Sequence, residues 1–233
     1  MYKKSSYHTY ALVVLSVVVL AGSAAMVGAA TPDPGPPLSS SFPGPMWAVV
    51  APVGGTASVA NAHLLLNIPG GSNHDALLPA NQHANQALRV VQPIGNVDFD
   101  VSIKIDSPVV ATDTGTSRGL MVLADDKDFI TFALTTDGTN ISLGAHTVTG
   151  GVAAAVFNDA VFSEYRSPMY LRITRAGSVY NTYYSVDGNV WTLAATFHDT
   201  SVPTSIGPFA GNYNGTPARA VPVTMSINWF DIL

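Results

Sequence analysis

The segment from Met169 to Phe197 constrains the fold more than any other part of the sequence, because it has the pattern of three short β-strands. Residues 171–174 alternate apolar and polar side chains, which is the period of a strand with one buried face. Residues 179–185 are rich in tyrosine and β-branched side chains, which suit a pleated, half-buried surface. This segment therefore predicts consecutive antiparallel strands.

Two tight turns separate these strands. The first is the tetrapeptide 175–178, and the second contains Asp187-Gly188, whose residues tolerate the positive φ that hairpins need. Apolar side chains then alternate along the third strand. The usual burial of tryptophan favours Trp191 packing in the core beneath its hairpin over stacking on a ligand. The alternating positions of the third strand are Trp191, Leu193, Ala195 and Phe197.

The same short, strand-like segments recur along the rest of the chain, separated by glycine-rich and aspartate-rich turns. No stretch after residue 46 shows a sustained helical period. Many short strands with regular turn signals are typical of a β-sandwich or barrel. The further predicted strands are residues 47–50, 56–60, 63–68, 87–91, 97–105, 119–124, 129–135, 140–148, 152–157, 206–213 and 223–232.

The chain carries few charges, and its charge balance excludes some classes of partner. Charged residues make up 11% of the 233 residues, whereas about a quarter is usual in soluble domains. The net charge of −5 and the lack of a basic run leave no electrostatic footprint for nucleic acid. The sequence contains no cysteine, which excludes disulfides, thiolate catalysis and cysteine-based zinc sites.

Residues 1–30 have the layout of an export signal. Two lysines precede the mainly apolar residues 11–20, and small apolar residues follow. This pattern favours a signal peptide cleaved after Ala25 or Ala30 over an uncleaved membrane anchor that spans residues 11–30. Either alternative predicts a secreted or cell-surface protein.

A linker and a single domain follow the export signal. Residues 31–45 are rich in proline, glycine and serine and cannot sustain a helix or a β-ladder. Residues 46–233 contain no further stretch of linker composition, so they are predicted to form one β-domain with a sizeable core.

The order of motifs in this domain resembles the concanavalin A-like lectin/glucanase superfamily. The similarity is strongest in the LRI-x-R…YS-x-DG-x-x-W run, and it favours the non-catalytic, laminin-G-like sandwiches of bacteria, including the C-terminal sandwich of β-xylosidases. The resemblance implies a jelly roll of two packed, curved antiparallel sheets that often binds carbohydrate on or beside the concave face. The motifs are Trp47, the strand 63–68, DFDVSIKI, RGLMVLADDKDFITF, LRITRAGSVYNTYYSVDGNVW, IGPFAGN and WFDIL.

Catalytic carboxylates are scarce. The hydrolases of this superfamily use paired glutamates in an E-x-D-x-x-E strand motif, whereas this chain has a single glutamate, Glu164. Asp98 and Asp100 share a strand face, but they are better interpreted as its solvated outer surface than as an inverting pair. No G-x-S-x-G elbow is present either, so an enzyme is the third-ranked interpretation.

The sequence also contains few features that indicate a metal site. The DDKD sequence at residues 125–128 offers oxygen ligands for calcium but is also a good polar turn. The resemblance implies a structural calcium ion near Asp231, an acidic position that the family often has in its last strand. At residues 41–43, however, Ser-Phe-Pro stands where relatives often carry an early aspartate.

Carbohydrate binding requires an exposed ring to stack on a sugar, with polar groups around it to hydrogen-bond the hydroxyls. The candidates come from outward-facing strand positions, from the polar loop after residue 68 and from the end of the strand 206–213. For Arg172 the alternative is a cross-strand pair, and for Tyr183 it is packing at a sheet edge. The candidate ligand-binding residues are Arg118, Arg172, Tyr183, His74, Asp75, Asn212 and Tyr213.

The sequence therefore favours an exported, non-catalytic module that binds a polysaccharide or another glycan. The alternative is a structural or adhesion sandwich that contacts other proteins and has no sugar site. These interpretations predict different responses to a glycan array.

Overall fold

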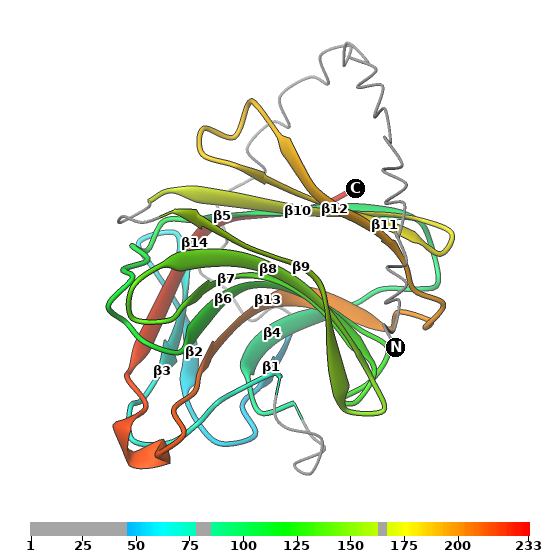
Figure 1. The fold of residues 1–233 in the computed structure, drawn as a ribbon. Coiled ribbons are helices and arrows are strands. Elements are labelled where there is room, and N and C mark those ends of the chain that lie inside the picture. Colours follow the sequence, from blue (N-terminus) through cyan, green and yellow to red (C-terminus); the bar gives the residue numbers. More distant parts are fainter. Residues whose placement is uncertain (1–45, 78–84, 163–166) are drawn as a thin grey trace, which may run out of the picture. The chain divides into compact units, whose positions relative to one another are not determined.

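The computed structural model describes residues 46–77, 85–162 and 167–233, which form two antiparallel β-sheets packed face to face (Figure 1). Sheet A has seven strands in the order β1-β4-β13-β6-β7-β8-β9, and sheet B has seven in the order β12-β11-β10-β5-β14-β3-β2. The all-β, two-sheet sandwich predicted from the sequence is confirmed. The predicted export signal and linker, residues 1–45, lie outside the described residues.

The bounds of the elements are as follows. The strands are β1 (Ala48–Val50), β2 (Thr56–Ala60), β3 (His63–Ile68), β4 (Leu88–Pro93), β5 (Phe99–Ile105), β6 (Thr116–Leu123), β7 (Phe129–Thr136), β8 (Ile141–Thr149), β9 (Val152–Phe162), β10 (Met169–Ala176), β11 (Val179–Ser185), β12 (Thr192–His198), β13 (Ser205–Asn212) and β14 (Val223–Ile232), with a 3₁₀ turn η1 (Pro217–Arg219).

Most predicted strands match these elements within a few residues. Strands β2, β3 and β14 have the predicted bounds, while β9 continues beyond its predicted end at residue 157. Val97, expected on the buried face of β5, precedes the strand and is 54% exposed. In the described part of the chain, no helix is both long and apolar enough to cross a bilayer.

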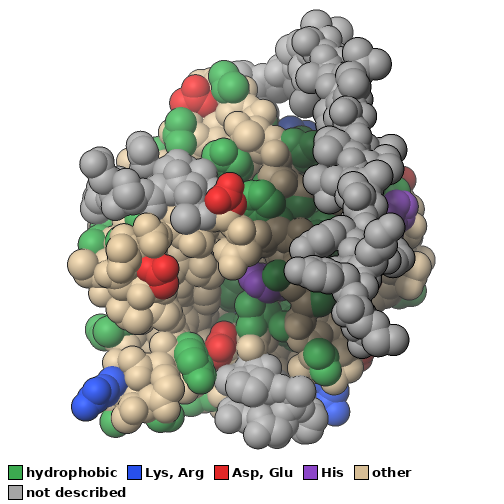
Figure 2. Space-filling view, in the orientation of Figure 1, with side chains coloured by type: hydrophobic (Ala, Val, Ile, Leu, Met, Phe, Trp, Pro, Cys, Tyr) green, Lys and Arg blue, Asp and Glu red, His purple; other side chains and the backbone are tan. Residues whose placement is uncertain are grey.

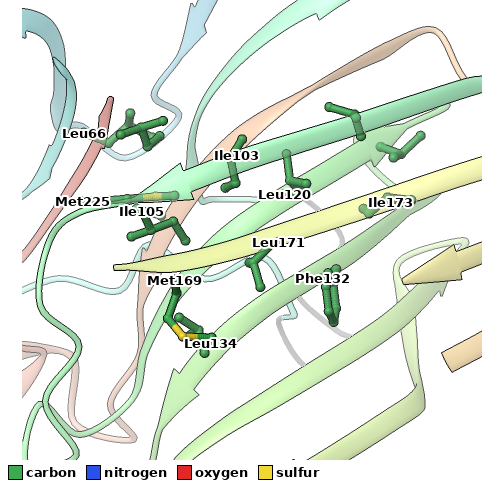
Figure 3. Close-up of a cluster of buried hydrophobic side chains, with 14 of the residues drawn as sticks. Leu66, Ile103, Ile105, Leu120, Phe132, Leu134, Met169, Leu171, Ile173 and Met225 are labelled. Carbon is green, nitrogen blue, oxygen red and sulfur yellow. The ribbon is translucent and has the colours of Figure 1, made fainter. Parts of the chain in front are cut away.

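The core lies between the two sheets and is built from alternate residues of facing strands. Figure 3 shows Ile103 of β5, Leu171 of β10 and Phe132 of β7 among the side chains that meet there. Because side chains on a strand alternate between faces, the intervening residues of each strand point outward. The inner face of each sheet is therefore closed, and any ligand site must lie on an outward face or at a rim.

The outward face of sheet A is hollowed and partly covered. In Figure 1 its strands arch with their concave side turned away from sheet B. A second, smaller apolar cluster lies on this face, where Phe209, Met121 and Phe129 pack with Ala76 and Ala87 from the segment that connects β3 to β4. The described parts of this connection, residues 69–77 and 85–87, thus cover part of the concave face.

A β-bulge changes the direction of side chains in β12. Thr182 of β11 pairs with Ala195, but the next residue, Tyr183, pairs with Leu193, so Ala194 is an extra residue in β12. As a result, Phe197 packs in the core against Tyr180, with stacked rings 5.6 Å apart, while Leu193 is 52% exposed.

The bulge overturns the prediction for Trp191. Its ring lies just before β12, is only partly buried and meets Tyr170 edge to face, with the ring centroids 6.4 Å apart. The expectation of a core tryptophan was wrong because an uninterrupted period of two does not hold across an inserted residue.

Candidate binding site

A small hollow of about 170 Å³ opens on the concave face of sheet A. It lies beside the apolar cluster on that face, and its walls come from β6, β7, β8, β13 and the segment that follows β3. The side chains that give it chemical character are Asp75, Ser117, Thr131, Thr135, His146 and Phe209.

The pairing of β7 with β8 places the polar groups of the hollow. Thr131 and Thr135 alternate with the core residues of β7, so they point away from sheet B. Thr131 lies opposite His146, and Ala133 lies opposite Gly144. A Cβ atom added at Gly144 would lie 3.0 Å from Cε1 of His146, so the imidazole rests on a position without a side chain.

The hollow has a mainly apolar lining that carries a few polar groups and little net charge. Burial lowers the pKa of His146, which favours the neutral imidazole. Burial raises the pKa of Asp75, an effect partly opposed by hydrogen bonds from the backbone N–H groups of Leu77 and Ala76. Hydroxyls, a neutral imidazole and one carboxyl group can hydrogen-bond to a neutral, hydroxyl-rich ligand.

We expect the imidazole of His146 to titrate below its ordinary value of 6.5 in an NMR pH titration of the ring protons, because burial disfavours its charged form. A lowered folded-state pKa also makes the stability of the protein depend on pH in a defined direction. The stability that the neutral ring contributes is present above pH 6.5 and is lost as the pH falls through the folded-state pKa. A midpoint at or above 6.5 would contradict this placement of the ring.

Of the residues predicted from the sequence, Asp75 lines the hollow and Tyr213 lies next to it. Oδ1 of Asp75 accepts a hydrogen bond of 3.0 Å from the backbone N–H of Leu77. Tyr213 is 40% exposed, and its backbone N–H donates to the carbonyl of Gly115, which lines the hollow. These two candidates are compatible with ligand contact.

His74, predicted in a polar loop, and Asn212, predicted at a strand end, are hydrogen-bonded to each other in the interior. They pair as an isolated antiparallel bridge, and both are almost fully buried. Oδ1 of Asn212 accepts hydrogen bonds from N and Nδ1 of His74 at 2.9 and 3.0 Å. The Nδ2 group of Asn212 donates to the carbonyls of Pro69 and Val221. These contacts tie the chain on either side of η1 to the end of β3.

Arg118 was expected on an outward-facing position, and this is wrong. It shares the inward face of β6 with Leu120 and Val122 and is 3% exposed. Its Nη1 group donates to the carbonyl of Pro108 at 2.9 Å, and Nη2 lies 3.6 Å from Asp113. Burial lowers the pKa of Arg118, an effect opposed by the nearby charge of Asp113.

Arg172 and Tyr183 lie on the outward face of sheet B, on the opposite side of the sandwich from the hollow. They pair directly across β10 and β11. Arg172 also forms a bidentate ion pair with Asp100, which is the structural alternative considered for it. The predicted site residues are therefore not brought together into one site.

Three further carboxylates considered from the sequence have structural partners. Asp98 accepts a hydrogen bond from the backbone N–H of Gly177, which fits its interpretation as part of an outer surface. In the DDKD sequence, Oδ1 of Asp125 accepts from the N–H groups of residues 127 and 128, as a polar turn requires. Asp126 pairs with the buried Arg89.

In the described ranges, Asp231 belongs to no cluster of acidic or histidine side chains. Asp231 lies opposite Ser102 on sheet B, and no group of three or more histidine, aspartate or glutamate side chains in these ranges is placed to hold a metal ion. Residues 41–43 and Glu164 lie outside the described residues.

Sequence reasoning missed His146, Thr131 and Thr135. A signal was present, because FITFALTT and ISLGAHTVT carry these polar side chains at the positions that alternate with core residues. The pattern did not reveal that they point into a concave face, since curvature and the covering segment arise from distant parts of the chain.

Solved structures share this fold, although the sequence matches no protein-family model and no curated protein. The GH43 protein BlXynB from Bacillus licheniformis aligns with a TM-score of 0.64 and 17% identity over 84% of this chain and 38% of that chain. A xylan β-1,4-xylosidase from Bacillus halodurans C-125 gives 0.55 and 15%, over 76% and 34%. The carbohydrate-binding module CBM66 from Bacillus subtilis gives 0.50 and 14%, over 80% and 94%.

These matches confirm the predicted resemblance at the level of the fold. The chain spans about a third of the length of the GH43 enzymes but nearly the whole of the CBM66 module. At such low identity a shared sandwich does not carry a function with it.

Proposed function

We propose that residues 46–233 form an exported, non-catalytic carbohydrate-binding module whose ligand occupies the hollow on the concave face of sheet A. The observation that carries the proposal is the set of hydroxyls, neutral imidazole, carboxyl and aromatic ring that converge there. Support also comes from the likeness of the fold to a carbohydrate-binding module that is covered over nearly its full length.

Each group in the hollow has a role that suits a sugar. The hydroxyls of Ser117, Thr131 and Thr135 can donate and accept hydrogen bonds, as can the neutral imidazole of His146. Phe209 is 2% exposed and packs in the apolar cluster, so it contributes an apolar edge to the wall of the hollow rather than an exposed stacking ring.

The size of the hollow limits the ligand. Its volume of about 170 Å³ is below the roughly 300–1,000 Å³ of clefts that enclose drug-sized ligands. The hollow therefore suits one sugar residue or a chain end, with the rest of the glycan in solvent.

The charge distribution favours a neutral glycan over a strongly charged polymer. In the view of Figure 2, acidic and basic side chains are scattered singly among apolar and uncharged ones. The net charge of −5 also disfavours polyanions such as nucleic acid.

The parts of the proposal that concern export and the lack of catalysis are supported by the sequence. Residues 1–30 have the layout of a signal peptide or membrane anchor, and the chain has a single glutamate. The engagement of Asp98 and Asp100 with Gly177 and Arg172 supports a structural role for this carboxylate pair.

A glycan array with the purified protein tests the proposal, followed by affinity electrophoresis in the polysaccharides that bind, with xylan and laminarin included. We expect His146→Ala and Thr131→Val each to weaken binding by about two- to tenfold, since each removes one hydrogen bond worth about 0.5–1.5 kcal/mol. His198→Ala, which removes an exposed histidine from β12, is the matched control and should bind like the parent.

Two results would contradict the proposal. If no glycan on the array binds the protein, the adhesion alternative, in which the sandwich contacts proteins, would be favoured. Binding that neither His146→Ala nor Thr131→Val weakens would remove the hollow as the site.

A further inference from the structure

The outward face of sheet B carries aromatic rings grouped around one arginine. Cζ of Arg172 lies 5.6 Å from the ring centroids of both Tyr183 and Trp191. Tyr170, two positions earlier on the same face of β10, meets Trp191 edge to face. We call Tyr170, Arg172, Tyr183 and Trp191 the aromatic cluster.

The arginine at the centre of this cluster is held rigidly. Its Nε donates to Oδ1 of Asp100 at 2.7 Å, and its Nη2 donates to Oδ2 of the same carboxylate. Contacts with the two rings restrict the guanidinium further. Ligand binding here therefore costs little side-chain conformational entropy.

One terminal nitrogen of the arginine remains available to donate hydrogen bonds to a ligand. The Nη1 group of Arg172 makes no hydrogen bond within the described part of the chain, and the Arg172 side chain keeps a quarter of its surface exposed. The cluster thus combines flat apolar faces with a fixed donor, which is the combination that recognises a sugar ring and its hydroxyls.

The two cations of this face are paired with carboxylates and one further carboxylate is not, which selects against anionic ligands. The guanidinium of Arg172 is paired with Asp100, and Lys104 is paired with Asp106 at 3.0 Å. Asp231 lies in the same cross-strand row as Arg172 and has no ion-pair partner among the described residues. A carboxylated or sulfated sugar would meet uncompensated negative charge here, whereas a neutral sugar would not.

We propose that the aromatic cluster is a second glycan-binding surface, separate from the hollow, whose occupant is a neutral polysaccharide. The exposed Leu193, directly opposite Tyr183, extends its apolar area. This inference extends the proposed glycan-binding function to a second site, and it rests on that proposed function.

The position of the two surfaces has a consequence for binding. The concave face of sheet A and the outward face of sheet B lie on opposite sides of the core, so each surface engages a different polysaccharide chain. The domain is thus bivalent, and it gains avidity on a dense polysaccharide and cross-links soluble chains.

The full-length protein and its variants test this with the neutral polysaccharides that bind on the array, xylan and laminarin included. We expect Trp191→Ala and Tyr183→Ala each to lower the affinity of the cluster by at least about fivefold. Both should abolish precipitation of the soluble polysaccharide while leaving binding through the hollow. His198→Ala should precipitate it like the parent, and His146→Ala combined with Trp191→Ala should bind more weakly than either single variant.

Tryptophan fluorescence separates ligand contact from a structural role. Polysaccharide should change the emission of the parent, and Trp191→Phe should remove that change while largely retaining binding, because phenylalanine keeps a stacking ring. If Tyr183→Ala keeps the melting temperature of the parent, its loss of binding is due to the missing surface contact and not to unfolding.

The outcomes distinguish the two sites. Binding lost in Trp191→Ala but unaffected by His146→Ala would support the cluster while overturning the hollow. Precipitation and affinity like those of the parent in both Trp191→Ala and Tyr183→Ala would overturn the cluster, as would a silent array. Self-association of the parent that Trp191→Ala removes, without any effect on polysaccharide binding, would assign this face to a second copy of the chain instead.

Discussion

Replacing Phe132 by alanine is expected to lower the free energy of unfolding by about 3–5 kcal/mol, because it leaves a large cavity in a closely packed core. Phe132 is fully buried on the inward face of β7, between the sheets (Figure 3). A domain of this size has about 5–15 kcal/mol of stability, so the loss is a large share of the total. Urea unfolding followed by circular dichroism measures it.

Trp191→Ala is the matched control, since it also truncates an aromatic ring to a methyl group. Its ring is partly exposed and contacts Tyr170 and Arg172 on the surface of sheet B. We expect a cost of about 0.5–1.5 kcal/mol, the usual worth of such aromatic contacts. A loss as large as that of Phe132→Ala would mean that Trp191 packs in the core, as the usual burial of tryptophan indicated.

Asn212→Ala is expected to cost about 2–4 kcal/mol, since it removes four side-chain hydrogen bonds that are worth about 0.5–1.5 kcal/mol each. The losses are the two bonds to His74 and the bonds to the carbonyls of Pro69 and Val221. The Nδ1 group of His74 keeps its bond to the carbonyl of Ser72, which offsets part of the cost. Thermal unfolding of the purified variant measures the change.

Tyr213→Ala controls for disturbance of the same strand end. Tyr213 is 40% exposed, and the bond from its backbone N–H to Gly115 survives the substitution, so stability should change by less than about 0.5 kcal/mol. If Asn212→Ala instead keeps its stability and loses glycan binding, Asn212 is a ligand residue, as its position at a strand end first indicated.

The strands of this protein were predictable from local patterns. The alternation in residues 99–105 and 129–136, and the turn residues at 177 and 187–188, reflect a side-chain period of two and backbone preferences that act over a few residues. Those local effects were sufficient for an antiparallel sandwich. The same reasoning identified Asp75, which lines the hollow, because an acidic residue in a polar loop usually reaches the surface.

Two misplaced residues show where local patterns fail. Arg118 was assigned to an outward-facing position, yet it lies on the same face of β6 as Leu120. Pro108 and Asp113 provide the partners that its burial requires. Trp191 was assigned inward on the usual burial of tryptophan, but the extra residue Ala194 in β12 breaks the alternation that leads from Phe197 back to Trp191. Partners from another loop and a shifted register are both invisible in the strand itself.

The candidate sites depend most strongly on long-range structure. His146 and Asp75 are 71 positions apart in the sequence (146 − 75) and meet because β8 lies in the concave sheet under the segment that follows β3. Local alternation is enough to define strands and turns, since each residue needs only its neighbours to choose a backbone conformation. Which face of a strand meets core, solvent or ligand follows from register, bulges and sheet curvature, and these exist only once distant segments pair and pack.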